Sequence, residues 1–513
     1  MDKTCLIIGA GLGGLFTGAL LARNGYKVTV IEKNATIGGG LQCFRRGDKL
    51  FETGMHIMGG FQPGGNLARI CDYLGILDRL KIEHLNPYCT DRIYYGKDGK
   101  SYVIGSGRQN FVKVLATQFP DEAEGIKAYV DELFDITERI PLFNLRPGIA
   151  DMTVEYGRFS MPADRLIAKH VRNEVLRELL AYLNPIYSGT PGHSPAYVHA
   201  LINVLFISGA SRFVGGSQQL ADTLAGCITD RGGQVVAGDP AQAITVENKA
   251  ITSVTTKSGR TFTPELVISS IHPVSLLKIL PPGTFTTAFT NRLNSIPNSF
   301  SAFSLYIDLK PDRFPYIPYT GYYLRDYGMM WNQATHEENQ NRWPHGFLYM
   351  TPPEPEQGPF ASRLLIHCPM EFDEVRRWED TTTGRRGQDY LDWKQDCGAK
   401  LIDALETIYP DIRKCIHKIY AASPLTIRDY YNVKEGSMFG YTHDSEDILY
   451  SQIPVRTKLS NLYLTGQNVM LHGICGVPLT AIKTVDAILG EDYIINQILE
   501  YYCPLKFFER LKN

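Results

Sequence analysis

The sequence predicts an α/β protein in which a parallel sheet that binds a dinucleotide is interleaved with an α+β domain that binds a substrate. Three observations support this class. A glycine-rich turn joins an apolar strand to a helix near the N-terminus, apolar strands recur in two later stretches, and two insertions of different composition separate these stretches. At 513 residues the chain is also too long for one ordinary core. We therefore expect two domains built from non-contiguous segments.

The glycine-rich turn, residues 9–14, precedes a helical run, and the strand after that helix stops at Glu32. This strand–turn–helix–strand pattern is typical of a Rossmann-like fold, which places a pyrophosphate at the N-terminus of the helix. Gly9 permits the tight turn, Gly11 lets the pyrophosphate approach the backbone, and Gly14 lets helix and strand pack closely. The predicted cofactor contacts in this turn are Gly9, Gly11, Leu12, Gly13 and Gly14.

Glu32 indicates which dinucleotide binds. A carboxylate at the end of the second strand accepts hydrogen bonds from the adenosine ribose, which suits FAD or NAD and repels the 2′-phosphate of NADP. A second glycine turn, residues 38–40, follows, and a longer cofactor needs such a turn to run on toward its isoalloxazine ring. We therefore predict FAD in a fold of glutathione-reductase type, with further contacts from Lys33, Gly39, Gly40 and Leu41.

The sequence does not identify the electron donor. No second glycine fingerprint flanked by a strand and a helix occurs, so a dedicated NAD(P)H domain is not expected. Two donors stay open: NAD(P)H that uses the substrate pocket, and a reduced electron carrier.

Apolar strands and turn signals divide the chain into interleaved segments. We expect an FAD domain of residues 1–75, 206–275 and 456–492, a substrate domain of residues 76–205 and 276–455, and a C-terminal tail of residues 493–513. The first insertion has amphipathic helical runs. The second is rich in aromatic residues and proline and predicts a sheet packed on a helix.

Within the later parts of the FAD domain the boundary signals are specific. Ser217 is a predicted helix N-cap, and residues 234–236 and 266–269 are predicted strands. A last strand over residues 462–467 precedes a helix that we expect to run from Pro478 to Leu489, with proline at its first position and glycine just past its end.

Composition limits the partners. The formal net charge of −2 gives no reason to expect nucleic acid. No run of about eighteen apolar residues occurs, so no membrane-spanning helix is expected. The first strand begins too close to Met1 for a signal peptide. The ten cysteines form no CxxC pair, which predicts reduced thiols in a cytoplasmic protein and no metal site.

The second insertion also bears on the substrate. Aromatic and apolar residues with little charge predict a substrate tunnel for a hydrophobic small molecule. The tail, residues 493–513, alternates apolar and aromatic residues with basic ones, which suits peripheral contact with the inner face of a membrane. A C-terminal helix packed on its own protein is an equal alternative. Nothing in the sequence predicts an oligomeric state.

Several motifs resemble the family of phytoene desaturases, carotenoid isomerases and retinol saturases, and the saturase branch in particular. The family pattern GxxFDxG corresponds to residues 47–54 and continues as GMHIMGG. Near the C-terminus, Pro424-Leu425-Thr426, residues 440–444 and residues 462–476 are similar to the saturase motifs. One departure is Gly40, where many members have an arginine, and Arg45 or Arg46 is a possible substitute.

The resemblance implies an FAD-dependent oxidoreductase that acts on C=C bonds of a polyene or isoprenoid substrate, with saturation favoured. It implies adenine contact at Ala241 and contact of Gly466 and Gln467 with the phosphates or ribityl chain. It also implies that a helix start at Val477, Pro478 and Leu479 faces the flavin pyrimidine.

Saturation of a C=C bond adds a hydride to one carbon and a proton to the other, so a general acid is one possible component. The candidates in the motifs are His56, Tyr441, His443 and His472. A flavin acting without any side-chain acid is equally open. Other functions compatible with the resemblance are desaturation, flavin-dependent cis–trans isomerisation and non-catalytic binding of prenyl groups, and an amine oxidase is a further alternative.

Overall fold

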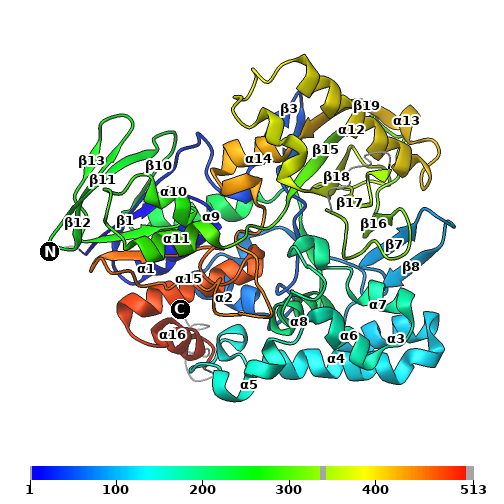
Figure 1. Cartoon of the computed structure of the whole chain (residues 1–513), viewed down its shortest axis with the longest axis horizontal. Coiled ribbons are helices and arrows are strands. Elements are labelled where there is room, and N and C mark those ends of the chain that lie inside the picture. Colours follow the sequence, from blue (N-terminus) through cyan, green and yellow to red (C-terminus); the bar gives the residue numbers. More distant parts are fainter. Residues whose placement is uncertain (1–2, 335–341, 504–513) are drawn as a thin grey trace.

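A computed structural model describes residues 3–334 and 342–503. Its first layer is a five-stranded parallel sheet with the order β10-β2-β1-β14-β20. The strands are β1 (Thr4–Ile8), β2 (Lys27–Ile31), β10 (Gln234–Val236), β14 (Leu266–Ser269) and β20 (Leu462–Leu464). The predicted α/β class is confirmed, and three stretches far apart in the sequence contribute strands to this one sheet (Figure 1).

Helix α1 (Leu12–Arg23) packs between the parallel sheet's other two main helices, α9 (Gln218–Thr229) and α15 (Gly473–Leu489). Gly14 lets α1 pack closely on the turn that follows β1, because a Cβ at this position would lie 2.0 Å from the carbonyl oxygen of Gly9. Ser217 occupies the predicted N-cap position, but its hydroxyl donates to the carbonyl of Leu41 instead of capping the helix.

The helix predicted to begin at Pro478 begins five residues earlier, at Gly473, and Pro478 lies inside it. The prediction of its start was wrong because glycine and cysteine over residues 473–476 read as a loop. These small residues instead form the first turn, beside the cavity described below. The predicted end is correct, since the C-cap is Gly490.

A second, seven-stranded sheet has the order β19-β15-β18-β17-β16-β7-β8. Its strands are β7 (Asp91–Tyr95), β8 (Ser101–Ile104), β15 (Ser301–Leu309), β16 (Thr320–Leu324), β17 (Gly346–Met350), β18 (Arg363–Met370) and β19 (Ile416–Ala422). One face packs on α12 (Gln388–Glu406) through a core that includes Phe303, Ile366 and Leu401. This is the predicted sheet on a helix, in the upper right of Figure 1. The first insertion adds the β7–β8 hairpin, which the sequence did not predict.

Below this sheet in Figure 1 lies a layer of helices from the first insertion. They are α3 (Arg108–Gln118), α4 (Ala123–Glu138), α5 (Met152–Phe159), α6 (Ala163–His170), α7 (Glu174–Leu180) and α8 (Ala196–Ser208). Three smaller β-units complete the fold. One is an antiparallel sheet of β11 (Ala241–Glu247), β12 (Ala250–Thr256) and β13 (Thr261–Phe262), and another is the hairpin of β3 (Cys43–Arg46) and β4 (Lys49–Glu52). The third is a sheet of β5 (Ile57–Met58), β9 (Ser211–Phe213) and β6 (Ile82–His84). Helices α2 (Asn66–Leu74), α10 (Pro273–Leu277), α11 (Thr287–Ser295) and α14 (Pro424–Tyr431) lie between them.

The start of the predicted tail forms α16 (Tyr493–Tyr501), which packs on α15 and α2 through Ile494, Ile495 and Ile498. The described part of the tail therefore matches a helix packed on its own protein, and the basic and aromatic residues from 504 onward lie outside the described residues. Over residues 3–334 and 342–503, no single helix has the length and apolar character needed to cross a membrane.

Candidate active site

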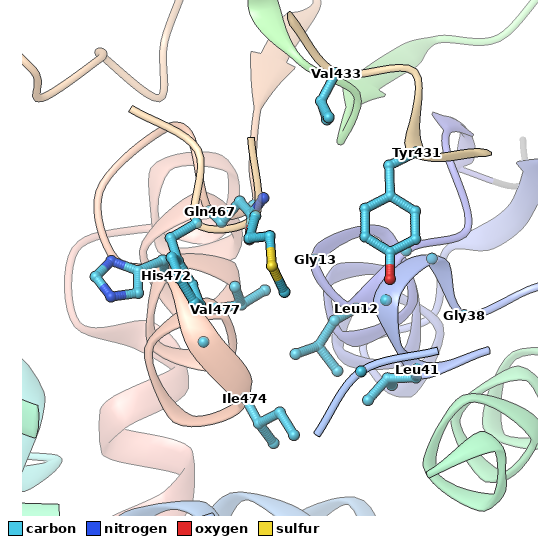
Figure 2. Close-up of a pocket in the computed structure, with 18 of the residues that line it drawn as sticks. Leu12, Gly13, Gly38, Leu41, Tyr431, Val433, Gln467, His472, Ile474 and Val477 are labelled. Carbon is cyan, nitrogen blue, oxygen red and sulfur yellow. The ribbon is translucent and has the colours of Figure 1, made fainter. Parts of the chain in front are cut away.

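A cavity of about 430 Å³ lies between the parallel sheet, the inner face of the seven-stranded sheet and helix α8. Figure 2 shows its two sides, with Leu12, Gly38 and Leu41 on one and Gln467, Ile474 and Val477 on the other. One end is lined by glycine backbone and the other by apolar side chains. The two ends have different chemistry and are described in turn.

At the glycine end, the two predicted glycine turns lie side by side. The Gly38 N–H donates to the carbonyl of Ala10, and a Cβ on Gly39 would lie 3.1 Å from the Cα of Gly11. Gly11 itself faces open space, because a Cβ there would have no protein atom within 4 Å. The backbone thus forms a cradle beside the N-terminus of α1, where free N–H groups and the helix dipole favour a phosphate.

Glu32 closes the far end of this cradle and is 7 % exposed. Its two carboxylate oxygens accept hydrogen bonds from the N–H groups of Ala10 and Asn34, at 2.9 Å each. Each oxygen retains a further lone pair, so the carboxylate can also accept from a ribose hydroxyl. Glu32 therefore holds the turn in shape in addition to facing the cavity.

Most of the predicted cofactor contacts line the cavity. They are Gly9, Gly11, Leu12, Gly13, Glu32, Lys33, Gly39, Gly40, Leu41, Ala241, Gly466, Gln467 and Val477. Three predicted contacts do not line it: Gly14 packs on the carbonyl of Gly9, and Pro478 and Leu479 lie beyond the first turn of α15. Pro478 and Leu479 were predicted as contacts because the helix was expected to start at Pro478.

The missing arginine at Gly40 is not replaced by Arg45 or Arg46. Both lie on the exposed end of β3, away from the cavity, and Arg46 stacks on Phe44. The group that approaches Gly40 is the hydroxyl of Tyr431, which donates to Thr53. Lys33 does not supply a free cation either, because its ammonium donates to the carbonyl of Asp429 at 2.7 Å and burial lowers its pKa.

The other end of the cavity is an apolar chamber. Its walls come from the 184–187 turn, helix α8, the inner face of the seven-stranded sheet and the loop before residue 440. The chamber is lined by Pro185, Ile186, Ile202, Leu205, Phe206, Phe300, Ala302, Leu348, Pro369, Met438 and Phe439. Among the described residues that line the whole cavity, the only aspartate, glutamate, lysine or arginine side chains are those of Glu32 and Lys33, both at the glycine end.

Of the four candidate acids, His56 has the arrangement of a proton donor. It lines the cavity, and its Nδ1 lies 3.1 Å from Oε1 of Glu52, whose carboxylate is buried. The same carboxylate oxygen accepts the N–H of Ser217 at 2.9 Å, which fixes Glu52 in place. A carboxylate at Nδ1 stabilises a protonated imidazole and leaves Nε2 available for a ligand. The sequence did not single out Glu52.

The other three candidates have less suitable surroundings. The hydroxyl of Tyr441 donates to the carbonyl of Leu293, and its ring lies in the core and not in the cavity wall. His443 lines a small neighbouring cavity and not the main one, with Nδ1 2.9 Å from the hydroxyl of Ser451. Its ring stacks on His472 at 6.1 Å.

His472 is the N-cap residue of α15 and lines the main cavity, but its ring points away from the space between Leu12 and Val477 (Figure 2). Burial lowers the pKa of His443 to about 4, and burial together with His443 lowers the pKa of His472 to about 3. Both imidazoles are therefore neutral near pH 7 and are poor proton donors.

The comparisons with known proteins agree with this geometry. A family model described as flavin containing amine oxidoreductase matches residues 12–301. The chain belongs to this flavoprotein family. It is an FAD-dependent oxidoreductase, as predicted, and the open cradle at Gly11 fits a dinucleotide.

Two curated relatives of this flavoprotein confirm the predicted resemblance. This chain is 26% identical to the all-trans-retinol 13,14-reductase of Danio rerio, over 96% of this chain and 86% of the relative. It is 22% identical to a 4,4′-diapophytoene desaturase of Methylomonas sp over 93% of this chain and 92% of the relative. The crystal structure of an oxidoreductase from Methanosarcina mazei shares the fold, with a TM-score of 0.64 and 17% identity over 94% of this chain and all of that one.

We expect the flavoprotein's Glu32→Ala variant to bind FAD more weakly by about 1.5–3 kcal/mol, the range for a hydrogen bond to a charged group. Glu32→Gln keeps the size of the side chain and one oxygen acceptor, so it should lose less. Titration of the apoprotein with FAD, followed by flavin fluorescence, measures the difference. An FAD affinity of Glu32→Ala equal to that of the wild type would show that Glu32 serves the turn alone.

Proposed function

We propose that this flavoprotein reduces a C=C bond in a hydrophobic polyene or isoprenoid-like substrate. The observation that carries this proposal is the apolar chamber that continues from the glycine cradle and has no aspartate, glutamate, lysine or arginine among its described residues. Such a chamber favours a neutral apolar substrate, because a charged one would lose its hydration without gaining a partner.

The proposed roles of the residues follow from the two ends of the cavity. Bound FAD supplies the hydride chemistry through its isoalloxazine ring. Gly11, Glu32, Gly39 and Gly466 would hold the dinucleotide, and the N-terminus of α15 would direct its positive end toward the ring. We assign the proton to Nε2 of His56, with Glu52 stabilising the charged imidazole.

The curated relatives support a C=C substrate. One is named for the reduction of retinol and another for the desaturation of diapophytoene. The family model carries the name of amine oxidoreductases, but an amine is a poor match to this chamber. A protonated amine needs a carboxylate or another acceptor of charge, and Glu32, at the opposite end, is the only carboxylate among the described lining residues.

The direction of the reaction is tested with chemically reduced, anaerobic holoenzyme. We expect a conjugated hydrophobic alkene to reoxidise the flavin and the product to be two mass units heavier, as the addition of a hydride and a proton requires. Mass spectrometry of the product with flavin absorbance in the same sample gives both readouts. A product of unchanged mass with the flavin still reduced would indicate isomerisation. A lighter product formed only by oxidised enzyme would indicate desaturation.

Three other expectations stay predictions: contact with a membrane surface, a cytoplasmic location, and NAD(P)H or an electron carrier as donor. An apolar substrate favours membrane contact. On the surface next to α16, Ile149 is 73% exposed and Val154 is 71% exposed, and the N–H of Gly148 donates to Asp492 at the start of that helix. These side chains would supply apolar contact area at a bilayer interface.

A further inference from the structure

His367 is a buried polar residue in the apolar roof of the chamber. It lies on β18 opposite Ser304 of β15 and Leu348 of β17, and directly paired residues share one face of a sheet. Its side chain therefore points to the inner face, where Ala302, Leu348 and Pro369 are its apolar neighbours in the chamber wall. The residue is 7 % exposed.

One ring nitrogen of His367 has a partner and the other does not. Nδ1 lies 3.1 Å from the hydroxyl of Ser304, while Nε2 is buried with no hydrogen-bond partner among the described residues. A buried polar atom without a partner is rare in folded proteins, and in a cavity wall it indicates a group supplied by a ligand.

The charge state limits what that group can be. Burial and the nearby His56 lower the pKa of His367 to about 3, so the ring is neutral at physiological pH. A neutral imidazole suits a neutral oxygen, because Nε2 donates to or accepts from a hydroxyl according to the tautomer, and donates to a carbonyl. A carboxylate would be buried beside this neutral ring, with no lysine or arginine among the described residues of the chamber, which is costly.

We propose that His367 recognises a hydroxyl or carbonyl oxygen on the substrate, so that the enzyme prefers an oxygenated polyene to the corresponding hydrocarbon. The inference rests on the proposed function and narrows its substrate class. Ser304 acts as a positioning residue, since its hydroxyl holds the ring in place through Nδ1. The two named relatives differ in this respect, because retinol is an alcohol and diapophytoene is a hydrocarbon.

The test compares all-trans-retinol with the hydrocarbon that has a methyl group in place of its terminal CH₂OH. Binding to oxidised holoenzyme is followed by perturbation of the flavin spectrum, and reduced enzyme is used for reoxidation rates. We expect wild type to prefer the alcohol by about tenfold or more, since a site built to bind a hydroxyl rejects the analogue without it. His367→Leu should reduce this ratio to near one by weakening the alcohol alone, and His367→Gln should restore part of it.

His272 provides a matched control. It lines the same cavity and is buried, but both of its ring nitrogens have protein partners, the N–H of Val274 and Oδ1 of Asn298. His272→Asn keeps an N-cap acceptor for α10 and should leave the preference for the alcohol unchanged.

Three results would overturn the proposal. The first is equal affinity of wild type for both compounds, or no binding of either. The second is equal weakening of both by His367→Leu, which would indicate packing. The third is a changed flavin spectrum or midpoint potential in substrate-free His367→Leu, which would place the ring against the flavin. Failure of the proposed function appears separately, as reduced enzyme that no alkene reoxidises even though the alcohol binds preferentially.

Discussion

Replacement of Gly11 by valine is expected to abolish FAD binding while the protein still folds. Gly11 has φ −75° and ψ 178°, an extended conformation that valine adopts without strain. A Cβ at this position would meet no protein atom within 4 Å. The valine side chain would instead occupy the cradle between the two glycine turns, where we place the pyrophosphate. The purified variant should be colourless.

The measurement is flavin absorbance of the purified protein, with thermal unfolding and circular dichroism of the apoprotein as checks of the fold. Gly358→Val is the matched control. Gly358 is exposed, a Cβ there also meets nothing within 4 Å, and it lies outside the cavity wall. This control should retain stoichiometric FAD. Stoichiometric FAD in Gly11→Val would show that the pyrophosphate does not cross Gly11.

His56→Ala is expected to slow reoxidation of the reduced flavin by an alkene by about 10²–10⁴-fold, the usual contribution of a general acid. Glu52→Gln tests the same arrangement without removing the imidazole. The amide oxygen still accepts the N–H of Ser217, but the negative charge beside His56 is lost. Reoxidation should therefore slow in Glu52→Gln as well, although by less than in His56→Ala.

Stopped-flow absorbance measures the reoxidation rates of both variants. Thermal unfolding checks whether Glu52→Gln disturbs the contact of residue 52 with the N–H of Ser217, just before α9. Tyr441→Phe is the control, because Tyr441 donates to a backbone carbonyl outside the cavity wall and should lose less than tenfold. A loss below about tenfold for His56→Ala as well would leave the flavin acting without a side-chain acid.

The FAD-binding half of the fold follows closely from local sequence. Strands 234–236 and 266–269 have the predicted bounds, since turn residues enclose short apolar runs at both. Helix α15 starts earlier than predicted because glycines that read as a loop form its first turn beside the cavity. Local signals report only the secondary-structure propensity of a segment. Packing against other segments decides where a helix such as α15 begins.

The polar groups of the chamber could not be predicted from the sequence, because packing between distant segments brings them together. His367 is one polar residue in a strand that is otherwise mostly apolar, and its partner Ser304 is 63 residues away in the chain. Only the register of β15 on β18 brings the two together. Likewise, the contact of Glu52 with Ser217 spans 165 residues. Composition predicted an apolar tunnel but not which polar atoms it encloses.

The contact between the first helix and the segment beyond residue 460 determines which parts of the chain the cofactor site needs. Gly13, in the first turn of α1, lies against Gly466, since a Cβ on Gly13 would be 2.7 Å from the Cα of Gly466. The sheet edge strand β20 and helix α15 likewise follow residue 460, whereas both glycine turns precede residue 41. The N-terminal fingerprint is therefore not a self-sufficient module. Its phosphate cradle is complete only when residues beyond 460 pack against it, so a fragment truncated before β20 should fail to retain the cofactor even though it keeps both glycine turns.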